Sequence, residues 1–176
     1  MGWTEQLGDM LKQYAGANAS NAPDSIDRDF DEIARDAPPS DLAEGLAASF
    51  RSDETPPFPQ MLGSLFGQGS GAQRAGMLSA LVSALGPQLV AQILGQRGGA
   101  LAEILGSGQT TVPPEVADQV PPAVVEEMAS KAEQRDPSVV DRLSSFVAAH
   151  PGLVKTLGAG ALAVALGSIA RRQQQG

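Results

Sequence analysis

Cysteine is absent from this chain of 176 residues, and histidine occurs once, as His150. Without a thiol the chain can form no disulfide, no thiolate metal site and no cysteine nucleophile. Catalytic triads and zinc sites also need several partners, which one histidine does not supply. We therefore predict no enzymatic activity, no cofactor and no metal site. An enzyme that assembles distant carboxylates is the remaining alternative. We interpret His150 as a cap on the last carbonyls of a helix.

Aromatic residues and positive charge are also scarce. The chain holds one Trp, one Tyr and five Phe, so aliphatic side chains must fill most of the core. The net charge is −8, and all of the imbalance lies in residues 1–55, where twelve acidic residues face four basic ones. Binding to a phosphate backbone needs clustered Lys and Arg. We therefore predict no nucleic-acid binding, and the acidic region indicates solubility or a basic partner.

Long hydrophobic runs are limited to one, Leu153 to Ala170, which Arg171 and Arg172 close. As a helix, its uncharged residues 156–170 would span about 22 Å, less than the ~30 Å hydrocarbon core of a bilayer. Four small residues in it, three spaced by four, would let another helix backbone approach closely. They are Ala159, Gly160, Ala163 and Gly167. We predict a helix buried in protein, with membrane insertion and a position in the bilayer interface as alternatives.

The remaining pattern is helical throughout. Residues 3–15 form an amphipathic helix with Trp3, Leu7, Met10, Leu11 and Tyr14 on one face, and residues 16–23 form a linker. No alternating strand pattern of useful length occurs. We predict an all-α fold of about eight to ten helices, many short and punctuated by Gly and Pro, with a long Gly/Ala-rich C-terminal helix.

The expected organisation is one helical domain, residues 24–176, preceded by the helix and linker of residues 1–23. Within the domain, residues 24–55 are acidic, residues 56–110 are apolar and glycine-rich, and residues 113–172 hold the C-terminal helices. Between Thr55 and Ala102 the only charged residues are Arg74 and Arg97. A segment so poor in charge is either the buried centre of the domain or an oligomer interface.

Two segments are similar to known ligand-binding loops, one for calcium and one for phosphate, but neither has all the residues that its motif requires. An EF-hand that begins at Asp27 needs Gly and Glu at its sixth and twelfth positions, where this chain has Glu32 and Pro38. Asp27 and Asp31 are instead expected on the solvated face of a helix. The glycine-rich residues 67–71 precede a helix but lack the Lys-Ser/Thr of a phosphate loop. We interpret them as a connector between helices.

Three phrases together resemble a group of bacterial helical proteins without an assigned activity. They are Asp41 to Phe58 (ending in Phe-Arg-Ser-Asp-Glu-Thr-Pro-Pro-Phe), Gln60 to Gly67, and His150-Pro-Gly-Leu-Val-Lys-Thr-Leu-Gly158. The chain is also loosely similar to the YidB-like bacterial proteins. The resemblance covers residues 40–170 and implies a bacterial, cytoplasmic helical protein, with a peripheral position at the inner membrane as the alternative. It implies no catalytic residues.

These observations favour a non-enzymatic, self-associating structural or scaffold protein, whose partner is another copy of itself. The expected interface joins the first helix to the small-residue ladder: Trp3, Leu7, Met10, Leu11, Tyr14, Ala159, Gly160, Ala163 and Gly167. The linker would let the first helix dock on a neighbouring copy. The alternative is a protein that associates with a membrane, a lipid or a quinone through its apolar C-terminal helix.

Overall fold

The computed structural model of the chain describes residues 3–16, 22–97 and 99–175. Within these ranges it contains twelve α-helices, two 3₁₀ turns and no strand, so the predicted all-α class is confirmed. Two of the helices, α8 (Pro114–Ala117) and α11 (Pro151–Val154), are single turns that start at a proline. Proline at the first helical position is favourable, which explains why there are more helices than the sequence pattern predicts.

The chain divides into two compact units and crosses from one to the other twice. The first unit comprises residues 1–57 and 144–176, and the second comprises residues 58–143. Helix α10 (Val139–Ala148) begins in the second unit and ends in the first. The segment of residues 1–23, expected to stand apart, shares the first unit with the C-terminal residues.

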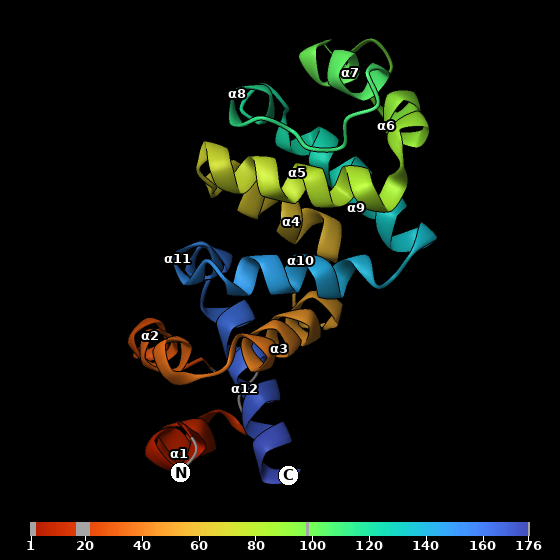
Figure 1. Ribbon diagram of the computed structural model, residues 1–176. Helices are drawn as coiled ribbons and strands as arrows, with labels where there is room; N and C mark the ends of the chain where they lie inside the picture. Colours follow the sequence, from red (N-terminus) through yellow and green to blue (C-terminus); the bar gives the residue numbers. More distant parts are fainter. Residues whose placement is uncertain (1–2, 17–21, 98, 176) are drawn as a thin grey trace. The chain divides into compact units, whose positions relative to one another are not determined.

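The first unit is organised around α12 (Ala159–Gln175), drawn in dark blue in Figure 1. Three helices pack on it: α1 (Trp3–Tyr14), α2 (Ile26–Asp36) and α3 (Pro39–Arg51). Every residue from Ala161 to Gly167 is buried. A helix this uniformly apolar has to be covered on all sides, and these neighbours cover it. The prediction that this run lies buried in protein agrees with the exposure of residues 161–170, whereas residues 155–160 are exposed or half-buried.

The sequence predicted one continuous C-terminal helix over residues 153–170. This prediction is wrong, because the structure interrupts the helix. After α11 the chain makes the 3₁₀ turn η2 (Lys155–Leu157), and Gly158 then takes a positive φ of 94°. The Thr156 hydroxyl donates to the Leu153 carbonyl at 2.6 Å, which closes this turn. The direction of the chain changes by 117° before α12 begins. Glycine reaches this backbone region without steric cost, so the bend lies where the sequence permits it.

The second unit is built from α4 (Phe58–Gln68), α5 (Gly71–Leu85) and α9 (Pro122–Arg135), which pack against one another. The shorter α6 (Pro87–Leu94), η1 (Gly95–Arg97), α7 (Gly99–Gly106) and α8 continue from this layer. The charge-poor segment supplies the buried residues of α4 and α5: Phe58, Met61, Leu62, Leu65, Phe66, Met77, Leu78, Leu81, Val82 and Leu85. The charge-poor segment was expected to be either the buried centre of the domain or an oligomer interface. For α4 and α5, burial within the domain agrees with the structure.

Local signals in the sequence explain how α5 starts and stops. The Ser70 hydroxyl accepts a hydrogen bond from the Gln73 amide at 3.3 Å, and the Gln73 side chain accepts one from the Ser70 amide at 2.9 Å. This capping box satisfies two amides that a helix start leaves unpaired. Gly86, with φ 87°, then ends the helix ahead of Pro87. The glycine-rich segment is thus a connector, as predicted.

Arg74 ties three parts of the second unit together. Its Nε and Nη2 donate to the carbonyls of Phe66 and Gly67 at 2.9 and 3.0 Å, which caps the end of α4. Its Nη1 lies 3.3 Å from a carboxylate oxygen of Asp118, just after α8. A cation at a helix C-terminus is favourable because the carbonyls there carry partial negative charge. One of the two charges in the charge-poor segment is therefore structural.

Candidate functional site

Helix α3 packs closely against α12. A Cβ added to Gly45 would lie 2.8 Å from the Ala165 carbonyl oxygen and 2.8 Å from Cγ1 of Ile169, so only glycine fits there. The buried Ser49 hydroxyl donates to the Ala161 carbonyl at 3.1 Å, and Arg172 pairs with Glu44. Close approach through small residues gives extensive van der Waals contact between helices. One side of α12 is thus covered by α3.

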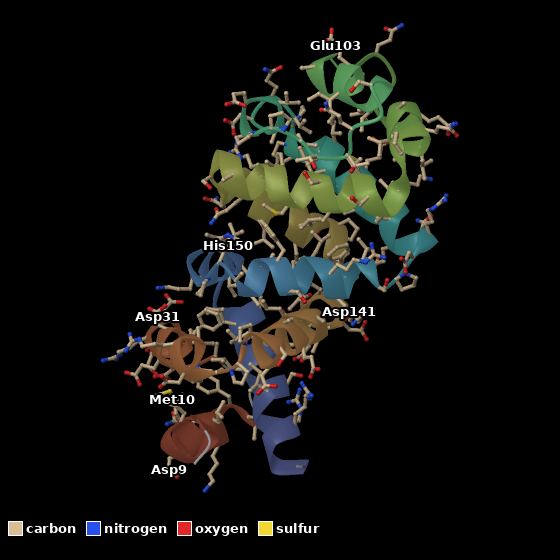
Figure 2. All side chains as sticks on the ribbon, in the orientation of Figure 1. Asp9, Met10, Asp31, Glu103, Asp141 and His150 are labelled. Atoms are coloured by element: carbon tan, nitrogen blue, oxygen red, sulfur yellow. The ribbon has the colours of Figure 1, made fainter. Side chains whose placement is uncertain are left out.

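Helix α1 packs on α12 and α2, and this contact is the candidate functional site (Figure 1). Leu7, Leu11 and Tyr14 follow one another at i, i+4 and i+7, and their exposures are 9%, 3% and 0%. Met10 is half-buried, and it leaves α1 on the side opposite the exposed Asp9 (Figure 2). The amphipathic pattern predicted for the first helix therefore corresponds to a face that is covered within the chain.

A buried polar contact fixes α1 at its C-terminal end. The Tyr14 hydroxyl donates to Oδ2 of Asp29 on α2 at 2.6 Å, and the Ser25 hydroxyl donates to the same oxygen at 2.9 Å. Burial raises the pKa of Tyr14, and the hydrogen bond to Asp29 raises the pKa of the phenol further. In addition, Nη1 of Arg171 on α12 donates to the Ala15 carbonyl at 3.2 Å. These contacts define the register of α1 on its two neighbours.

The nine residues expected at an interface fall into four groups by their exposure. Leu7, Leu11, Tyr14, Ala163 and Gly167 are buried in the chain, and Met10 and Gly160 are half-buried. Ala159 is exposed, and the Trp3 side chain lies outside the described residues, as do linker residues 17–21. The structure thus brings α1 and α12 together within one chain. Whether they also meet between chains stays a prediction.

Four residues of the site were not anticipated from the sequence: Ser25, Asp29, Gly45 and Arg171. Of the two acidic residues of α2 expected on a solvated face, Asp27 is exposed, and Asp31 is half-buried and pairs with Lys155 at 2.9 Å. Asp29, for which the sequence predicted no role, accepts the hydrogen bond from Tyr14. The spacing of Gly45 and Ser49, one helical turn apart, was the available signal for α3.

His150 has the structural role that its position predicts. Its Nδ1 lies 2.9 Å from the Phe146 carbonyl in the last turn of α10, and its ring stacks on Phe146 with centroids 4.7 Å apart (Figure 2). The ring therefore adds a second contact to a carbonyl at the end of the helix, which also accepts a hydrogen bond from the Ala149 amide at 3.2 Å. Among the residues that the structure describes, no three His, Asp or Glu side chains are grouped so as to hold a metal ion.

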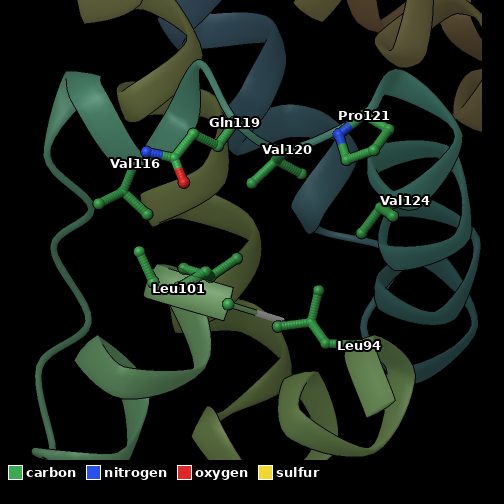
Figure 3. Close-up of a pocket in the computed structure, with 9 residues that line it drawn as sticks. Leu94, Leu101, Val116, Gln119, Val120, Pro121 and Val124 are labelled. Atoms are coloured by element: carbon green, nitrogen blue, oxygen red, sulfur yellow. The ribbon is translucent and has the colours of Figure 1, made fainter. Parts of the chain in front are cut away.

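The second unit contains a small pocket, shown in Figure 3. Leu94 and Leu101 lie on one side of it, and Val116, Val120 and Val124 lie on the other (Figure 3). Its volume of about 60 Å³ is far below the several hundred that an organic ligand fills. Gln119 contributes the one polar side chain among the described lining residues. We interpret the pocket as a packing defect.

No described helix is by itself long and apolar enough to cross a bilayer. Two bent pairs, α5 with α6 and residues 151–157 with 159–172, reach the required length and composition only when taken together. No protein-family model matches the chain, and searches of curated proteins and of solved structures find no match. The resemblance to bacterial helical proteins therefore stays a prediction.

Proposed function

We propose that this protein is a non-enzymatic helical scaffold whose copies associate by exchanging α1. The observation that carries the proposal is the docking of α1 on α12 and α2. An element that packs along one face and is joined to the rest by a single linker can make the same contacts on a neighbouring copy. Exchange needs no new surface, because the same site receives either the chain's own helix or that of its neighbour.

The composition of the linker supports exchange. Residues 16–23 read Gly-Ala-Asn-Ala-Ser-Asn-Ala-Pro, without a charged or large apolar side chain. Small polar residues of this kind do not favour one compact path between two helices. The choice between a chain's own site and a neighbour's then depends on effective concentration, which linker length controls.

The size of the α1 contact also suits exchange. Among the side chains of α1 that the structure describes, three are buried, those of Leu7, Leu11 and Tyr14. Each fully buried side chain of this kind contributes about 1.5–3 kcal/mol, so α1 can be held firmly and still detach without global unfolding. By contrast, α3 meets α12 through interlocking contacts at Gly45 and Ser49. We therefore assign exchange to α1 and not to α3.

Sedimentation velocity of three proteins tests the proposal. The wild-type chain should show a second, faster species whose share grows with concentration. Leu11→Asp places a charge in the docking face and should leave only the monomer of 18.1 kDa. Gln13→Asp introduces the same charge on the exposed side of α1 and should behave like the wild type. If wild type and Leu11→Asp are both monomeric at every concentration, the proposal fails.

A further inference from the structure

A groove of about 610 Å³ lies in the second unit where the chain bends between α5 and α6. The two helix axes differ by 111°, and Gly86 makes the turn. The ends of α7 and α9 complete the walls. The volume falls within the range of about 300–1,000 Å³ that is typical of small-molecule sites. Unlike the pocket of Figure 3, this groove has room for an organic ligand.

Both apolar and polar residues line the groove. Leu89 on α6 is half-exposed, and Leu85 and Leu105 are buried, with 2% and 5% of their surface exposed. Gln88 and Gln92 stand one turn apart on α6 and are both exposed. Their amides provide hydrogen-bond donors next to an aliphatic surface. A ligand that fits this arrangement has a hydrocarbon part and a polar end.

Arg135, in the last turn of α9, is the charged residue of this lining. Its guanidinium makes no hydrogen bond and no ion pair with the residues that the structure describes. The neighbouring carboxylate does not neutralise it, because Asp136 accepts hydrogen bonds from Ser138 at 2.7 Å and from Arg142 at 2.6 Å. A guanidinium without a carboxylate partner, in a chain of net charge −8, is the complement of an anionic group.

We infer that this groove binds a fatty acid. The carboxylate would pair with Arg135, the amides of Gln88 and Gln92 would donate to its oxygens, and the acyl chain would lie along Pro87 and Leu89. This inference does not depend on exchange of α1, since every residue involved belongs to the second unit.

Calorimetric titration with laurate, below its critical micelle concentration, tests the inference on the full-length protein. One saturable site per chain is expected. Arg135→Gln should weaken binding by at least about tenfold, the usual loss for a charge-assisted hydrogen bond. Arg28→Gln removes an exposed arginine from α2 in the first unit and should leave the affinity unchanged.

Two further titrations distinguish binding at this groove from nonspecific binding of the hydrocarbon chain to the protein. Leu89→Glu places a negative charge on a half-exposed position that the core does not need, and it should abolish binding while circular dichroism stays unchanged. Dodecanol has the same chain without the charge and should bind at least about tenfold more weakly than laurate. The inference is overturned if laurate fails to saturate, or if Arg135→Gln and Leu89→Glu both bind it as the wild type does.

Discussion

At the scale of single residues, the contact that decides the position of α1 is the hydrogen bond between Tyr14 and Asp29. The phenol is fully buried, and the carboxylate it meets belongs to a helix whose acidic residues look solvated in the sequence. A buried hydroxyl that loses its acceptor, or a carboxylate that loses its donor, destabilises the docked state. The consequences can be measured through Tyr14, because it is the one tyrosine in the sequence.

Tyr14→Phe keeps the apolar ring and removes the hydroxyl that donates to Asp29. We expect the free energy of unfolding to fall by about 1.5–3 kcal/mol, the usual loss for a hydrogen bond to a charged group. Urea denaturation followed by circular dichroism measures this change. Gln13→Ala, on the exposed side of the same helix, should change stability by less than about 0.5 kcal/mol. Equal stability of Tyr14→Phe and wild type would contradict the role given to this bond.

The pKa of Tyr14 predicts how docking depends on pH. Since the pKa is raised above the ordinary value of about 10, the docked state favours the neutral phenol. The stability that this preference adds is fully present below pH ~10 and is lost as the pH rises through the raised pKa. Ultraviolet absorbance of the phenolate should therefore show a higher midpoint in the native protein than in denaturant. Coincident midpoints would mean that Tyr14 is not buried against Asp29.

At the scale of helices, the backbone approach of α3 to α12 fixes the first unit. Gly45→Ala would force a methyl group against the Ala165 carbonyl and the Ile169 side chain. We expect a loss of about 1–3 kcal/mol, as for other overpacked contacts. Gly8→Ala in α1 is the matched control, because a Cβ there meets nothing within 4 Å. That change should stabilise the protein by about 0.5–1 kcal/mol, since alanine favours the helix. Thermal unfolding of both variants should move the midpoints in opposite directions.

The same scale shows what a sequence can and cannot predict. The end of α5 at Gly86 and its start after Ser70 depend on neighbouring residues, so local pattern is sufficient for them. The bend at Gly158 was missed, because the small-residue ladder that starts directly after it, at Ala159, favours a continuous helix. The roles of Asp29 and Gly45 depend on partners distant in sequence, and one sequence does not show which helices meet.

At the scale of the whole molecule, charge opposes association. Each copy carries a net charge of −8 at pH 7, so two copies repel each other at low ionic strength. Salt screens this repulsion, with a Debye length that falls to about 3 Å at 1 M. We therefore expect the oligomer fraction of the wild-type chain to rise with sodium chloride concentration in sedimentation experiments. Dissociation by salt would instead indicate an interface held by ion pairs.

Exchange of α1 between copies is tested most directly by light scattering on the wild-type chain and on a variant that lacks residues 18–20. Shortening the linker hinders α1 from reaching its own site and leaves a neighbour's site accessible. We predict that the mass of the wild type rises above 18.1 kDa with concentration, and that the shortened variant reaches the dimer at lower concentration. A constant mass of 18.1 kDa for both proteins, with helical content unchanged, would contradict the account.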